Sequence, residues 1–141
     1  MWRWGAIALC LASSIAAVAQ ERRCTQQQAQ QAEEAVDTLN SWDGLHDWYK
    51  TYSQCDDGGA AEGVSEAVAR NLVDRWESLS RLGELAKDAR FRRFVLKHVD
   101  ATLNADDLKK IGVNAEKRCP TSLHALCREL KMRAEAPWGR R

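Results

Sequence analysis

Apolar residues recur every three or four positions along most of the chain, and no stretch alternates regularly between apolar and polar residues. This spacing places apolar side chains on one face of a helix, whereas alternation is typical of a half-buried strand. Residues 24–40 form such a face from small side chains, and residues 41–52 form one that includes Trp and Tyr. Since about two residues separate these helices, the pattern predicts an antiparallel helical hairpin.

The same periodicity predicts a third helix at about 60–79, a short segment around 79–88 and a more apolar helix over 91–103. Asn104 is expected to cap the next helix, with Asp107 at its third position. Amphipathic helices of this kind need one another to cover their apolar faces.

Pro120 is expected to end that helix, because proline lacks the backbone N–H that a helix interior requires. Thr121 or Ser122 would then cap the last helix, and residues 136–141 would form a frayed tail. Together these segments predict one all-α domain, a compact bundle of six or seven short helices around a single core.

Residues 1–19 have the pattern of an export signal. Arg3 precedes a short apolar run, and small residues before Gln20 form a cleavage site. The run is too short to span a bilayer comfortably. We therefore expect cleavage after Ala19, a mature domain of residues 20–141, and a periplasmic or secreted location.

Export changes the charge balance of the chain. The full sequence has 21 basic and 20 acidic residues, and removal of Arg3 with the signal leaves 20 of each. A protein that binds nucleic acid carries a concentrated positive charge, which this balance does not indicate. We expect no nucleic-acid partner and no membrane insertion after signal cleavage.

Four cysteines remain in the predicted mature chain, an even number that in an exported protein indicates two disulfides. They are Cys24, Cys55, Cys119 and Cys127. An antiparallel hairpin would bring Cys24 beside Cys55, and Cys119 and Cys127 flank the turn at Pro120. We therefore predict the pairs Cys24–Cys55 and Cys119–Cys127, with a cross-link between more distant helices, such as Cys55–Cys119, as the competing arrangement.

The stretch YSQCDDGGAAEGVSEA, residues 52–67, has the densest candidate chemistry. It is not a calcium loop of the helix–loop–helix type, because Asp56 and Asp57 are adjacent and Glu62 comes too early for the required ligand spacing. It is not a nucleophile elbow, because no strand precedes Ser65. Glu62 and Glu66 share a helix face and, together with a buried His98, would be the groups of a small cell-wall or polysaccharide hydrolase.

A plainer interpretation is a disulfide followed by a helix start, with the acids complementing the helix dipole. His46 is expected to lie on a solvated polar face and His124 at a helix start, so the histidines are not spaced as a metal set. His98, on the flank of an apolar face, is expected to be buried and bonded to a carbonyl or carboxylate. No catalytic residue, metal or cofactor is predicted.

The signal peptide, the helix ending in YSQC, the Ala-rich amphipathic helix after it and KRC near the C-terminus resemble the periplasmic Rap/Tai-type immunity proteins of type VI secretion systems. That family inhibits peptidoglycan amidases. The resemblance implies a small helical, disulfide-bonded protein that occludes a cell-wall-targeting toxin, and no inhibitory residue is carried across. An envelope interaction or structural protein is the alternative, followed by the hydrolase.

A binding protein of this kind would present a rigid surface next to a disulfide. We expect that surface in the turn after Cys55 and the first turns of the following helix. The expected partner-binding residues are Asp56, Asp57, Glu62, Ser65 and Glu66. Acids at an interface rim mainly steer association, so the expected partner is a protein with a basic surface.

Overall fold

The computed structural model describes residues 23–139, and these residues form an all-α bundle stapled by two disulfides. The predicted signal peptide, its cleavage site and residues 140–141 lie outside the described residues. The helices are α1 Gln26–Val36, α2 Trp42–Tyr52, α3 Gly58–Asp74, α4 Leu79–Leu85, α5 Ala89–Lys97, α6 Ala105–Lys117 and α7 His124–Glu135. The 3₁₀ turns are η1 Ser53–Cys55, η2 Trp76–Ser78 and η3 Thr121–Leu123.

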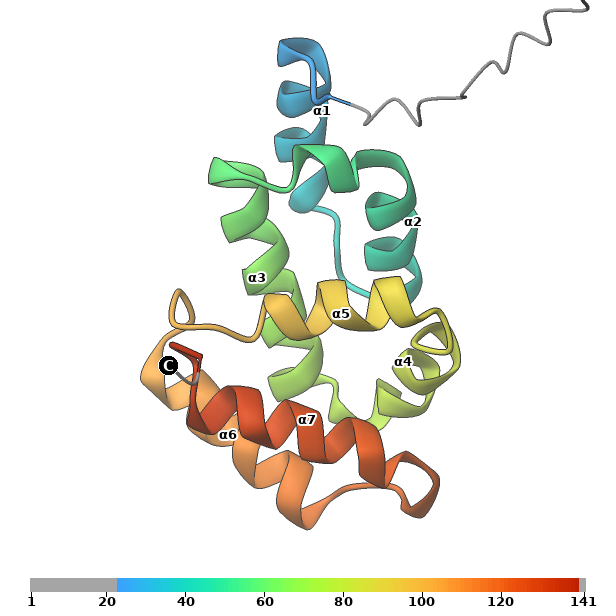
Figure 1. Cartoon of the computed structure of the whole chain (residues 1–141), viewed down its shortest axis with the longest axis vertical. Helices are drawn as coiled ribbons and strands as arrows, with labels where there is room; N and C mark the ends of the chain where they lie inside the picture. Colours follow the sequence, from blue (N-terminus) through green and yellow to red (C-terminus); the bar gives the residue numbers. More distant parts are fainter. Residues whose placement is uncertain (1–22, 140–141) are drawn as a thin grey trace, which may run out of the picture.

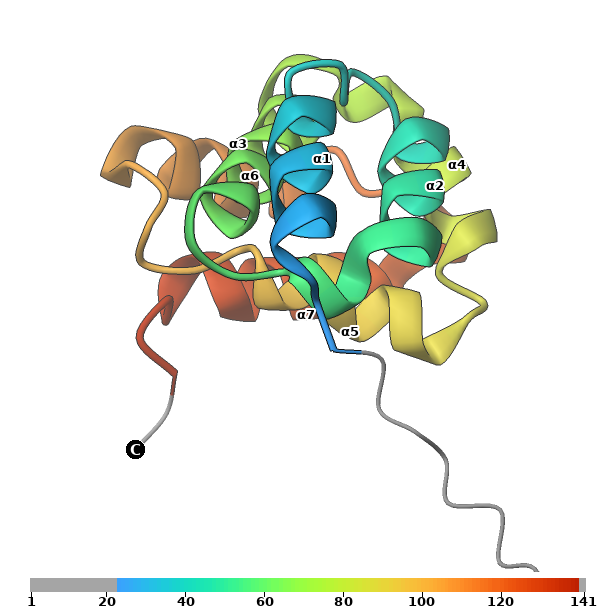
Figure 2. The ribbon, with the colours of Figure 1, turned by 90° about the horizontal axis from the view of Figure 1, so that it is seen from above.

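The long helix α3 occupies the centre of the bundle. It packs against α1 and α2 on one side and against α6 on the other, while α5 crosses in front of it (Figure 1). Helices α6 and α7 form an antiparallel pair at the opposite end from α1 and α2. Seen from above, α1, α2 and α3 stand together over α5 and α7 (Figure 2).

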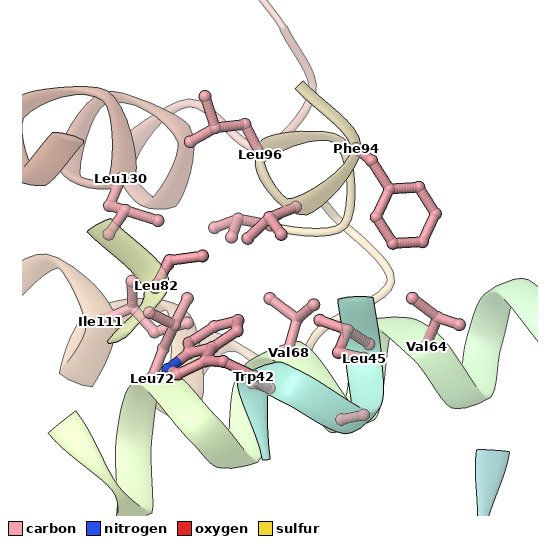
Figure 3. Close-up of a cluster of buried hydrophobic side chains, with 14 of the residues drawn as sticks. Trp42, Leu45, Val64, Val68, Leu72, Leu82, Phe94, Leu96, Ile111 and Leu130 are labelled. Carbon is pink, nitrogen blue, oxygen red and sulfur yellow. The ribbon is translucent and has the colours of Figure 1, made fainter. Parts of the chain in front are cut away.

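Side chains from each of the helices α1 to α7 meet in one core along α3. Val64, Val68 and Leu72 lie one turn apart along α3 and point to the same side (Figure 3). They face apolar side chains of the surrounding helices, which include Leu45, Leu82, Phe94, Leu96, Ile111 and Leu130 (Figure 3). The periodicity of the sequence therefore identified the buried faces correctly, because burial of apolar area is the main favourable term in folding.

Local side chains cap the starts of several helices, and the cap by Asn104 confirms the prediction from the sequence. Thr25 and Gln28 form a reciprocal capping box at α1, and Asn104 accepts from the backbone N–H of Asp107 at 2.8 Å. Such caps satisfy backbone donors that have no partner within the helix. The connection between α1 and α2 spans residues 37–41 and is longer than predicted, since the N–H groups of Thr38 and Leu39 close the end of α1.

The predicted helix over 60–79 is wrong at its C-terminal end. Helix α3 ends at Asp74, and η2 separates it from α4. Arg75 leaves the helical conformation with φ −131° and ψ 39°. The indole N–H of Trp76 donates to the carbonyl of Arg118 at 2.9 Å, so a contact with the end of α6 replaces continuation of the helix.

Three smaller expectations also need correction. The helix expected over 91–103 is α5, Ala89–Lys97, and the chain then turns where the Asp100 carboxylate accepts from the backbone N–H and the hydroxyl of Thr102. Helix α7 begins at His124 without a side-chain cap from Thr121 or Ser122, because η3 turns so that Leu123 packs against Gly83 of α4. His46 is not solvated on all sides, since its ring lies edge-on to Phe91 with centroids 4.7 Å apart.

Candidate functional site

The turn after Cys55 joins α2 to α3 and is held on both sides. The disulfide Cys24–Cys55 ties it to the start of α1, with Cα atoms 5.0 Å apart, as predicted. Gly58 has φ +52°, a conformation that L side chains rarely adopt, and the carboxylate of Asp57 caps α3 by accepting from the Gly58 N–H at 2.8 Å. The start of α3 is therefore fixed by a covalent bond and by local backbone geometry.

We use the name acidic corner for Asp56, Asp57, Glu62, Ser65 and Glu66, the residues expected to bind a partner. The structure divides them into two groups. Asp57, Glu62 and Glu66 are exposed, whereas the side chains of Asp56 and Ser65 face the interior. Glu66 is also paired with Arg70, whose Nε lies 2.9 Å from Glu66 Oε1.

Asp56 anchors the turn to α5. Its side chain is only 7 % exposed, and its carboxylate lies 2.7 Å from Lys97 Nζ and 3.1 Å from His98 Nε2. Burial opposes ionisation of this carboxyl, but the hydrogen bonds from His98 and Lys97 outweigh burial and hold the pKa of Asp56 below its usual range. The carboxylate is therefore an internal acceptor.

Ser65 completes a line of buried polar groups. Its Oγ lies 2.8 Å from His98 Nδ1, so the ring of His98 connects Ser65 of α3 to Asp56 of the turn. His98 is 2 % exposed, which confirms the prediction of a buried histidine bonded to a carboxylate. No local spacing in the sequence links His98 to Asp56 or Ser65, and the one available signal is that Ser65 lies on the flank of the apolar face of its helix.

The combination Ser65–His98–Asp56 has the residue types of a hydrolase triad, but its setting is different. A triad also needs preorganised donors for a developing oxyanion. Ser65 lies inside α3, beyond its first turn, where backbone N–H groups are already engaged in the helix. Glu62 and Glu66 also place negative charge beside Ser65. The arrangement therefore acts as a buried hydrogen-bond network that joins α3, α5 and the turn.

A surface cavity of about 320 Å³ opens above this network. It lies between the first turns of α3 and the segment that follows α5, and its lining residues are Glu62, Ser65, Glu66, Thr102 and Leu103. The hydrolase alternative requires a pocket that joins the glutamates to His98. Among the described residues, His98 does not line this cavity, because Ser65 lies between it and the two glutamates.

The second disulfide, Cys119–Cys127, also forms as predicted and lies at the far end of the bundle between α6 and α7. Within residues 23–139, no cluster of His, Cys, Asp and Glu is arranged to hold a metal ion. In the same part of the chain, none of the helices is both long enough and apolar enough to cross a membrane.

The chain matches no family model, and comparison with curated proteins and with solved structures found no match.

Proposed function

We propose that the chain is an exported protein-binding module, most concretely a periplasmic immunity or inhibitor protein that occludes a cell-wall-targeting toxin. The exposed carboxylates of Asp57, Glu62 and Glu66 would contact a basic surface of the partner. The predicted signal peptide and the resemblance in the cysteine-bearing segments support export and this class of partner.

The proposal rests on the observation that the acidic corner is held in a fixed position. A disulfide holds it from one side, and the Ser65–His98–Asp56 network holds it from the other. Binding loses less conformational entropy when the contact surface is already ordered. Three exposed carboxylates on an ordered surface fit recognition by charge better than catalysis.

Capture of a partner by the mature, oxidised protein tests the proposal. Retained proteins are identified by mass spectrometry, and binding of the identified partner is then measured with the triple variant Asp57→Ala, Glu62→Ala, Glu66→Ala. A control triple variant, Glu34→Ala, Glu77→Ala, Glu116→Ala, removes the same charge from exposed positions elsewhere. We expect the first variant alone to lose capture at low salt, with helicity unchanged in both.

Equal capture by both triple variants would contradict the assignment of the acidic corner. Capture of an envelope protein that is not a toxin, with no inhibition of its activity, would favour the alternative of an envelope interaction protein without an inhibitory role.

A further inference from the structure

A second cavity, of about 450 Å³, lies beside the C-terminal end of α3 and along the exposed face of α6. Its apolar part is formed by Val73 of α3 and Val113 of α6, and Val113 is 42 % exposed. Its basic side chains come from α6 and the C-cap of that helix, and they are Lys109, Lys110 and Arg118. None of these residues belongs to the acidic corner, so this surface is separate from the one proposed above.

Arg118 is an exposed cation that is held against the wall of this cavity. Its Nη1 donates to Asn114 Oδ1 at 3.1 Å, and the amide of Asn114 donates in turn to the backbone carbonyl of Leu72 at 3.1 Å. Asn114 also lines the cavity and is buried, so it orients the guanidinium that it contacts. The contact uses one nitrogen of the guanidinium, whose remaining donors suit a carboxylate in geometry as well as charge.

Lys109 and Lys110 supply positive charge at the other end of the cavity. Both are exposed, and none of the ion pairs among the described residues includes them or Arg118. Asp106 also lines the cavity, one turn before Lys110, and leaves the wall with more positive than negative side chains. An anionic ligand is therefore favoured.

The two basic ends of the cavity are well separated. Lys110, Asn114 and Arg118 follow one another at intervals of four residues, so they share one ridge of α6. At the rise of an α-helix, Lys110 and Arg118 are about 12 Å apart along its axis. Long side chains on a helix lean toward its N-terminus, so both charges shift in the same direction and stay apart. A single small anion therefore reaches only one end.

We infer that this cavity binds an extended acidic peptide segment in which two carboxylates flank an apolar residue. In an extended chain, positions i, i+2 and i+4 share one face, and positions i and i+4 are about 13 Å apart. One carboxylate would bind Arg118, and the other would lie at Lys109 and Lys110. The apolar side chain between them would contact Val73 and Val113.

Binding is tested by titrating the ¹⁵N-labelled mature, oxidised protein with the peptide acetyl-GESLSEG-amide and following the amide shifts of Val73 and Val113, which line the cavity. The isomer acetyl-GSELESG-amide has the same composition and charge, but its acids are too close together to reach both basic ends. We expect saturable shifts at low salt with the first peptide and binding at least about tenfold weaker for the isomer, since it loses a charge-assisted contact. The peptide acetyl-GESSSEG-amide lacks the apolar side chain and should also bind more weakly.

One pair of variants tests the contact at Arg118. Arg118→Gln is expected to weaken binding of acetyl-GESLSEG-amide by about tenfold or more, and Arg118→Lys less, because lysine keeps the charge without the planar donors. Lys117→Gln serves as the control, since it removes the neighbouring exposed charge, which does not line the cavity. It should bind as the wild type does.

A second pair of variants tests the other end of the cavity. The double variant Lys109→Gln, Lys110→Gln should weaken binding of the same peptide by at least about fivefold, because one carboxylate loses its basic partners. The double variant Arg90→Gln, Arg93→Gln removes the same charge from exposed positions of α5 and should bind normally.

The inference is overturned if acetyl-GESLSEG-amide gives no saturable shift, if the isomer binds as tightly, or if either cavity variant binds as its control does. If Arg118→Gln does not fold, the lysine double variant decides instead. The peptide is titrated without any partner of the acidic corner, and the triple variant Asp57→Ala, Glu62→Ala, Glu66→Ala should bind it as the wild type does. Failure here therefore leaves the proposed role of the acidic corner untouched.

Discussion

At the scale of single residues, His98 joins parts of the chain that are far apart in sequence. Its two ring nitrogens contact Ser65 of α3 and Asp56 of the turn after Cys55. Because all three side chains are buried or nearly so, loss of one partner leaves the others without a substitute from water. The strength of this network is open to direct measurement.

His98→Ala is expected to lower the free energy of unfolding by about 1–3 kcal/mol, because Ser65 and Asp56 lose a buried partner. Denaturant unfolding of the mature, oxidised protein measures this change. His124→Ala, at an exposed position, should stay within about 0.5 kcal/mol of the wild type. A His98→Ala protein that is fully stable yet inactive would instead make the histidine functional.

Asp56 should make stability depend on pH in the acid range. Its pKa is lower in the folded protein than the usual value of an aspartate, about 3.9. Its contribution is therefore fully present above about pH 4 and is lost as the pH falls through the folded-state pKa. Asp56→Asn should be less stable than the wild type near neutral pH, with a difference that shrinks on acidification.

Unfolding free energies of the two proteins, compared from about pH 6 down to about pH 2, measure this effect. A difference that is constant over that whole range would contradict the assigned ion pair.

At the scale of elements, close helix contacts and the two disulfides set the arrangement of the bundle. Helix α1 approaches α3 where Gly63 faces Val36, and a Cβ placed on Gly63 would lie 2.5 Å from Val36 Cγ2. At its other end, α1 is tied to η1 by the Cys24–Cys55 bridge. The N-terminal end of α1 is thus held by a covalent bond, and its C-terminal end is held by close packing of Val36 against Gly63.

Gly63→Ala is expected to destabilise the fold by about 1–3 kcal/mol, because the clash involves Val36 Cβ as well as its flexible methyl groups. The better helix propensity of alanine offsets only part of this loss. The double variant Gly63→Ala, Val36→Ala removes the clash and should regain stability relative to Gly63→Ala. Thermal unfolding of the wild type, the two single variants and the double variant gives the energy of interaction between positions 36 and 63. If the effects of the two substitutions simply add, the two side chains are not closely packed.

The two disulfides should contribute unequally. Their sequence separations are 31 residues for Cys24–Cys55 and 8 residues for Cys119–Cys127. Chain-entropy arguments give about 4 kcal/mol for the longer loop and about 3 kcal/mol for the shorter one. Replacing each pair by serine and measuring denaturant unfolding tests the order. A larger loss from the Cys119–Cys127 pair would show that native-state effects outweigh loop entropy.

At the scale of the whole molecule, charge is balanced overall but distributed unevenly. The predicted mature chain carries equal numbers of basic and acidic residues, yet Asp57, Glu62 and Glu66 lie exposed within the first turns of α3 or at its cap. In the proposed complex, long-range attraction to the partner would therefore come from the local arrangement of these carboxylates and not from net charge.

Association with a basic partner should slow by at least about tenfold between about 50 mM and about 500 mM salt, because salt screens the steering charges. Stopped-flow association rates measure this with the partner found by capture. The triple variant Asp57→Ala, Glu62→Ala, Glu66→Ala should lose most of the salt dependence. If the association rates of the wild type and the triple variant depend on salt to the same extent, the charges that steer association lie elsewhere on the protein.

Features that depend on neighbours along the chain could be predicted from the sequence alone. Helical periodicity, the Asn104 cap and the two disulfide pairs are of this kind, because a helical face repeats every few residues and the cysteines lie at the ends of adjoining helices. The export signal is also a local pattern, and it stays a prediction.

Which polar residues meet depends on how the helices pack. Ser65 and His98 are 33 positions apart, and Asp56 and His98 are 42 apart, so no local spacing pairs them. The end of α3 at Asp74 likewise depends on Trp76 reaching Arg118, 42 positions away. The cavity at Arg118 is made by α3 and α6 together. Such contacts follow from how helix faces pack, and periodicity identifies a face without identifying its partner.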